Sequence, residues 1–176
     1  MRPSLVYRPE FFQEESTRTS ADESTRPKFP LSKLDGVNYW VLPQPAEIAK
    51  YVNIVLREEW ERDALFEGRN PEEDAWLNSL PSRKWSLRTV DLHEIHPDPR
   101  IMELTIPATG YAFRKELKSR TSRLVSALRA EETVIPPLVI GNEDRTLKDG
   151  HCRYHALLKL RAKRVFVYSG RLIRKD

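Results

Sequence analysis

The sequence contains a single cysteine, Cys152, among its 176 residues. One cysteine excludes an intramolecular disulfide and any zinc site built from several cysteines. The sequence also lacks an apolar run that approaches the roughly 20 residues of a membrane span. Charged residues interrupt the first 15 positions, so we expect no secretory signal. These absences predict a cytoplasmic protein with no membrane segment.

Apolar residues are scarce at 39%, whereas charged residues make up 32%. This balance predicts one modest core with an extension. We expect residues 1–35 to be disordered or extended, residues 36–84 to form a helical extension, and residues 85–176 to form a compact domain. All the tryptophans precede or begin that domain, and we interpret them as packing the extension onto the core, with stacking on nucleic-acid bases as the alternative.

Charge is distributed unevenly along the chain. Residues 113–176 contain 16 Lys and Arg but 7 Asp and Glu, a net charge of +9, which leaves −5 for residues 1–112. This asymmetry predicts a polyanionic partner for the C-terminal part, namely nucleic acid, nucleotide phosphates or an acidic protein. The alternative is a solvated basic helix face followed by a basic tail.

Hydrophobic periodicity and the positions of proline and glycine predict a mixed order of strands and helices. The order predicts an α+β (mixed α/β) fold with a small mixed sheet and packed helices. We expect strands at 37–42, about 87–92, 138–141, from 146, and 164–169, and helices at 45–66, 71–80, 110–130 and after Gly150.

The helix expected at 110–130 has one apolar face and one basic face. A basic face of this kind can track a nucleic-acid backbone. Its candidate nucleic-acid-binding residues are Lys115, Lys118, Arg120 and Arg123.

The second candidate site is the Asp149-Gly150 turn, which is followed at once by a helix. The first amides of a helix have no intrahelical acceptor and lie at its positive end, so such a turn favours anions. A guanidinium at Arg153 is well matched to a phosphate. The alternative is an arginine that pairs with Asp149.

The residues around this turn resemble a known family. The segments VDLHEIHPDPR and IPPLVI…TLKDGHCRYHALLKLRAKRVFVY are similar to the ParB/sulfiredoxin-like superfamily, whose pattern contains a D-G-H-x-R-x-x-A core between a strand and a helix. The resemblance covers about residues 87–169. Cys152 occupies the family's second histidine position, whereas sulfiredoxins carry G-C-H-R, and this difference puts a sulfinic-acid reductase in doubt.

The resemblance implies a nucleotide, ATP or CTP, with Mg²⁺ if chemistry occurs. We expect Gly150, His151, Cys152 and Arg153 to bind its phosphates, and Asp98, His151 and Asp149 to be the catalytic candidates. Each has an ordinary alternative: an N-cap carboxylate for Asp149, a partly buried ring for His151, turn chemistry for Asp98 and an inert buried thiol for Cys152.

Three functions follow from these residues. The first is a nucleotide-binding protein that hydrolyses NTP or transfers a phosphoryl group, as an ATPase or phosphotransferase. The second is a DNA-associated factor or nuclease of the plasmid or mobile-element type. The third is a non-catalytic regulatory or interaction protein, with a protein partner bound through the N-terminal extension. We expect no helix-turn-helix domain before Asp176, and therefore no complete chromosome-partition protein.

Overall fold

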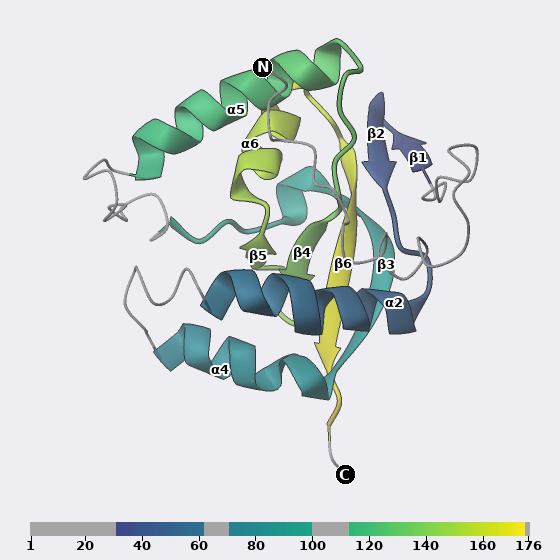
Figure 1. Ribbon diagram of the computed structural model, residues 1–176, viewed down its shortest axis with the longest axis vertical. Helices are drawn as coiled ribbons and strands as arrows, with labels where there is room; N and C mark the ends of the chain where they lie inside the picture. The colour runs from purple at the N-terminus through teal and green to yellow at the C-terminus, as the bar shows by residue number, and fades with distance from the viewer. Residues whose placement is uncertain (1–30, 62–70, 100–112, 175–176) are drawn as a thin grey trace, which may run out of the picture.

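The structure is a computed structural model that describes residues 31–61, 71–99 and 113–174. A four-stranded sheet lies between two layers of helices (Figure 1). The strand order is β3-β6-β4-β5. The strands are β3 (Arg83–Asp91), β4 (Leu138–Gly141), β5 (Leu147–Asp149) and β6 (Arg164–Leu172).

The sheet is mixed, as the sequence predicted. The strand β6 pairs antiparallel with β3 and parallel with β4, and β4 pairs antiparallel with β5. The helix between β5 and β6 makes the connection that returns the chain to the sheet. The chain therefore has an α+β fold. Within the described residues, no helix combines the length and the apolar character needed to cross a membrane.

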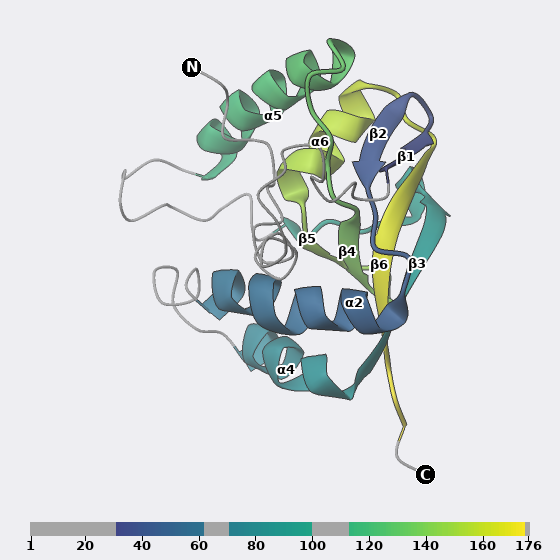
Figure 2. The same cartoon turned by 45° about the vertical axis from the view of Figure 1, so that its right-hand side comes forward.

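Alternate residues of the short central strand β4 face different helical layers. Leu138 and Ile140 are fully buried in the cluster that includes α5 (Phe113–Arg129) and α6 (His151–Lys159). Val139 is buried in the cluster formed with the N-terminal helices. Successive strand residues point to opposite faces of a sheet, so this alternation puts one helical layer on each face. Figure 2 shows the same separation from a second direction.

The N-terminal part of the described chain forms a hairpin. Strand β1 (Leu31–Leu34) pairs antiparallel with β2 (Val37–Trp40). The turn between them contains Asp35 and Gly36 at positive φ. The Asp35 carboxylate accepts hydrogen bonds from the backbone amides of Lys163 and Arg164. The predicted boundary at residue 35 therefore falls inside a hairpin. Residues 1–30 of that predicted segment lie outside the described residues.

The predicted helix 45–66 is present up to residue 61, where the described segment ends. It begins as α2 (Pro45–Lys50) and continues through a π-helical stretch, Tyr51–Leu56. In that stretch Asn53 Nδ2 donates a 2.8 Å hydrogen bond to the carbonyl of Ala49. The helix buries its central apolar residues. These residues are Ile48, Val52 and Leu56.

Tryptophans join the N-terminal helices to the sheet, as we expected. The ring centroids of Trp60 and Trp76 are 6.0 Å apart, and those of Trp76 and Trp85 are 6.2 Å apart. Trp76 lies in α4 (Pro71–Ser79) and Trp85 lies in β3. Trp85 is fully buried. Residues 36–84 thus share a core with the domain that follows them.

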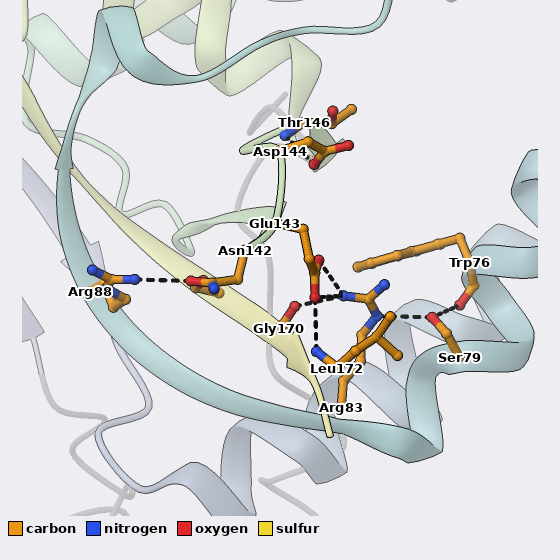
Figure 3. A network of polar contacts seen from close by, with 11 residues as sticks. Trp76, Ser79, Arg83, Arg88, Asn142, Glu143, Asp144, Thr146, Gly170 and Leu172 are labelled. Carbon is orange, nitrogen blue, oxygen red and sulfur yellow. Dashed lines mark hydrogen bonds and ion pairs between the residues drawn. The ribbon is translucent and has the colours of Figure 1, made fainter. Parts of the chain in front are cut away.

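The guanidinium of Arg83 is the centre of a polar network beside this aromatic cluster (Figure 3). It contacts the carboxylate of Glu143 at 3.0 Å and the carbonyl of Gly170 at 2.7 Å. Its Nε donates to the Ser79 hydroxyl at 2.8 Å. The Arg83 side chain is 8% exposed and lies 4.4 Å from the centre of the Trp76 ring. This network connects β3, the β4–β5 hairpin, β6 and α4.

Candidate functional site

The candidate site is the α6 turn, which we define as residues 149–153. Strand β5 ends at Asp149, Gly150 has φ 97° and is the N-cap of α6, and no side chain caps the helix. The amide of Tyr154 makes a 2.8 Å bond to the Gly150 carbonyl. The amides before it lie in the first turn, where a helix offers no i−4 carbonyl. Asp149 is therefore not the N-cap, and that alternative for it is wrong.

The guanidinium of Arg153 lies inside the protein. Its Nη1 donates to the carbonyls of Pro136 and Pro137 at 2.8 and 2.7 Å, and its Nη2 donates to Asp149 Oδ2 at 2.6 Å. The side chain is 11% exposed. The alternative interpretation, pairing with Asp149, is thus what the structure shows, although the pair is largely buried. The phosphate-binding role of Arg153 stays a prediction.

A β-bridge brings Asp98 to the same edge of the sheet. His96 pairs with Thr146, the residue before β5, and its carbonyl accepts a 2.9 Å bond from the amide of Leu147. Pro97 and Asp98 follow this bridge directly, and Asp98 is half-buried. The negative charge of Asp98 acts on the pKa of His151, so the two side chains lie in the same neighbourhood. The nearby carboxylate Glu94 instead forms an ion pair with Arg145.

His151 lies in the first turn of α6, and its imidazole ring is uncharged near neutral pH. Burial lowers its pKa from 6.5 to about 4, because the low-dielectric surroundings disfavour the charged ring, and the charges of Asp149 and Asp98 only partly oppose this effect. Among the described residues, its Nε2 atom is buried and has no hydrogen-bond partner. The structure thus brings the three predicted catalytic residues together. Their catalytic roles stay predictions.

Helix α5 packs against α6 and brings arginines to the turn. Burial raises the pKa of the Cys152 thiol, and the charges of Arg120, Arg153 and Arg123 act in the opposite direction. Arg120 and Arg123 are therefore near the first turn of α6. The net direction favours the protonated thiol, which agrees with the interpretation of Cys152 as an inert group.

Sequence reasoning missed Thr121. This residue is 2% exposed, and its hydroxyl donates to Cys152 Sγ at 3.8 Å. Its position held a signal, because it is a polar residue on the apolar face between Leu117 and Leu124. A polar side chain on a buried helix face needs a hydrogen-bond partner, and here the partner is the thiol in the α6 turn.

Three of the four predicted nucleic-acid-binding residues can be placed in the structure. Lys118, Arg120 and Arg123 are exposed on α5. The side chain of Lys115 lies outside the described residues. The structure therefore connects two predictions that the sequence kept apart, since two arginines of the basic helix are close to the α6 turn.

Comparisons with known proteins give a limited result. No protein-family model matches the sequence, and no curated protein matches it. Two solved structures are similar to part of the chain: a pNOB8-like ParB N-domain, with 23% identity and a TM-score of 0.36, and a second form of the Pnob8-like ParB-N domain, with 17% identity and a TM-score of 0.37. The matches cover 52% of this chain but 29% and 32% of those chains. The site described above rests on this chain's own residues.

Proposed function

We propose that this chain is a ParB/sulfiredoxin-like protein that binds a nucleotide through its phosphates at the α6 turn. The observation that supports this proposal is the packing of α5, which carries Arg120 and Arg123, against the first turn of α6, where Thr121 contacts Cys152 at 3.8 Å and Gly150 is the N-cap. Backbone amides at a helix N-terminus and nearby guanidinium groups both favour a phosphate. The D-G-H-x-R pattern at the same position adds to this argument.

The balance of charges assigns the phosphate contacts mainly to α5 and to the helix end. The Arg153 cation and the Asp149 anion are in direct contact at 2.6 Å, so their charges largely cancel at a distance. Arg120, Arg123 and the amides of the first turn each contribute positive potential beside the turn. A ligand with several phosphate charges gains more from this potential than a monoanion does.

Hydrolysis or phosphoryl transfer is the finer part of the proposal. We assign Asp98, whose negative charge acts on His151, as the base for the attacking group. Within the described residues, no group of three or more His, Cys, Asp or Glu residues is arranged to hold a metal ion. A Mg²⁺ ion would therefore take most of its ligands from the phosphates and from water, with Asp98 as the contributing side chain.

The test is a thermal shift of the protein with ATP, CTP, ADP or pyrophosphate, each with and without Mg²⁺. A ligand at about 100 times its Kd stabilises the fold by roughly 2.7 kcal/mol, a rise in Tm of about 2–4 °C or more. We expect this rise to shrink in Arg120→Ala and Arg123→Ala and to persist in Arg129→Ala, whose side chain is exposed near the other end of α5. The absence of a rise with every nucleotide would refute the proposal.

Release of phosphate from the bound nucleotide measures the finer part. We expect Asp98→Asn to keep the thermal shift and to lose phosphate release. A wild-type protein that binds nucleotide and releases no phosphate would instead favour the non-catalytic regulatory function.

DNA association is the second candidate function, favoured by the exposed basic face of α5. Lys118 is an exposed residue of that helix. We expect Lys118→Ala to weaken DNA binding without changing the nucleotide shift. DNA binding to this face would fall steeply as salt rises, because each neutralised phosphate releases counterions. Binding that is insensitive to salt would contradict it.

A further inference from the structure

We infer that Arg153 is a positioning residue that holds the α6 turn in its binding geometry, and that it is not itself the ligand of the phosphate. This inference rests on the proposed function, because it assigns roles within that site. The sequence alone favoured the opposite role, since arginine next to free amides is well suited to contact a phosphate directly.

The three acceptors of the Arg153 guanidinium come from separate parts of the fold. The carbonyls of Pro136 and Pro137 belong to the segment that enters β4, and the Asp149 carboxylate ends β5. Arg153 itself lies in the first turn of α6. A planar guanidinium directs its donors in fixed directions. The three bonds therefore fix the start of α6 relative to the ends of two strands.

The guanidinium also packs directly against the turn. A β-carbon added at Gly150 would lie 3.0 Å from Arg153 Cζ and Nη2, and 2.7 Å from Leu138 Cδ2. Only the hydrogen of a glycine fits between these groups. Gly150 therefore lies close to both Leu138 and the Arg153 guanidinium, and these two groups limit where the start of α6 can lie.

Moving this guanidinium to a ligand would be costly. The Arg153 side chain is 11% exposed and the Asp149 side chain is 22% exposed. If Arg153 turned towards a phosphate, the Asp149 carboxylate and two carbonyls would lose their donors in a largely buried place. Buried groups that lose their partners are strongly destabilising. Arg120 and Arg123 of α5 are exposed, so a contact between either of them and a phosphate leaves the bonds of Arg153 intact.

The substitution Asp149→Asn distinguishes a phosphate-contacting role of Arg153 from a positioning role, because the two roles predict changes of the Kd in opposite directions. If Arg153 contacts the phosphate directly, removing the neighbouring negative charge strengthens the binding of ATP or pyrophosphate. If Arg153 positions the turn, the same substitution weakens its strongest bond and therefore weakens binding. We expect the Kd to rise about tenfold, the loss of one charge-assisted hydrogen bond. Asp91→Asn is the matched control, since it removes one charge from the opposite edge strand, β3.

A conservative change at Arg153 and a double variant complete the test. Arg153→Lys keeps the positive charge but cannot reach three acceptors with a planar fork. We therefore expect this variant to bind ATP or pyrophosphate more weakly than the wild type does. The variant with both Asp149→Asn and Arg153→Lys is expected to bind no worse than Arg153→Lys alone, because that single variant already disrupts the bond to Asp149. Tighter binding by Asp149→Asn, or additive effects in the double variant, would overturn the inference.

Hydrogen exchange in the ligand-free protein keeps this inference separate from the proposed function. The amide of Tyr154 makes the first bond of α6, to Gly150, and the amide of Leu160 bonds to Ala156 at the other end. We expect Asp149→Asn and Arg153→Lys to lower the protection of Tyr154 and to leave that of Leu160 unchanged. If wild-type protein binds no nucleotide, the proposed function fails, whereas unchanged protection of Tyr154 is what refutes the positioning role.

Discussion

At the scale of single residues, two glycines in left-handed conformations have different surroundings. Gly150 has φ 97° and Gly36 has φ 81°, but a β-carbon at Gly36 would meet nothing within 4 Å. A left-handed residue with a β-carbon costs roughly 1–2 kcal/mol. We expect Gly36→Ala to lose about that much stability in urea unfolding, and Gly150→Ala to lose about 1–3 kcal/mol more through its contact with Leu138. Equal losses would contradict the packing described for Gly150.

His151 predicts a pH dependence of stability. Burial lowers its pKa to about 4 in the folded protein, with Asp149 and Asp98 raising it and His155 and Arg153 lowering it. The unfolded chain, with a pKa of about 6.5, takes up the proton first as pH falls. Stability is therefore complete above pH 6.5 and is lost between about pH 6.5 and 4, by up to about 3 kcal/mol.

The measurement is urea unfolding at several pH values, for wild type and His151→Gln. We expect the variant to lose less stability than wild type over this range. The pKa of His155 is also lowered by burial, so a smaller dependence of the same sign remains. Identical pH profiles for the two proteins would show that His151 does not titrate in this way.

At the scale of elements, two ion pairs of similar length differ in burial. Glu143 contacts the buried Arg83 at 3.0 Å and also accepts the amide of Leu172. Glu131 contacts Lys33 at 3.2 Å with both side chains more than half exposed. We expect Glu143→Gln to cost about 1–3 kcal/mol, because it leaves a buried cation less well compensated. Glu131→Gln is the control and should change stability by less than about 1 kcal/mol.

Amide exchange in β6, measured together with unfolding in urea, distinguishes a local effect of Glu143→Gln from a global one. The Glu143 contacts hold the β4–β5 hairpin to the end of β6 (Figure 3). We therefore expect Glu143→Gln to increase amide exchange in the last residues of β6 as well as to lower the midpoint in urea. An equal loss of stability in Glu131→Gln and Glu143→Gln would contradict the effect that we assign to the burial of Arg83.

At the scale of the whole molecule, the N-terminal helices and the sheet share one core. Leu56 is fully buried in a cluster with Val139 and Tyr168 of the sheet, and the Tyr168 hydroxyl accepts the amide of Leu42 at 2.9 Å. We expect Leu56→Ala to lower stability by about 2–5 kcal/mol. Ile54→Ala is the control: its side chain is 44% exposed, and the expected loss is about 0.5 kcal/mol or less.

This shared core also predicts how the protein unfolds. The tryptophans report on residues 40–85, and amide exchange in β6 reports on the sheet. We expect both probes to give the same midpoint in urea, and Leu56→Ala to shift the two midpoints equally. Two separate transitions would instead support residues 36–84 and 85–176 as independent units.

The sequence by itself determined the order of elements and the place of the α6 turn. The apolar periodicity of α5, the short buried run of β4 and the Asp149-Gly150 turn are local signals, because helix and strand periods and left-handed glycines are set by neighbouring residues. The same reasoning placed residues 31–34 in an irregular segment. Strand β1 pairs with β2, and the turn between them is held by bonds from the amides of Lys163 and Arg164, which are distant in sequence, to the Asp35 carboxylate.

The tertiary structure alone decided which side chains of the site meet. A guanidinium is well suited to bind a phosphate, but in this fold the donors of Arg153 are directed to Pro136, Pro137 and Asp149. Arg120 and Arg123 belong to a different helix, yet their charges reach Cys152. Hydrogen bonds and electrostatic interactions act over a few ångströms in space and not along the chain. Packing of α5 on α6 and of two strand ends against one guanidinium therefore set roles that spacing could not.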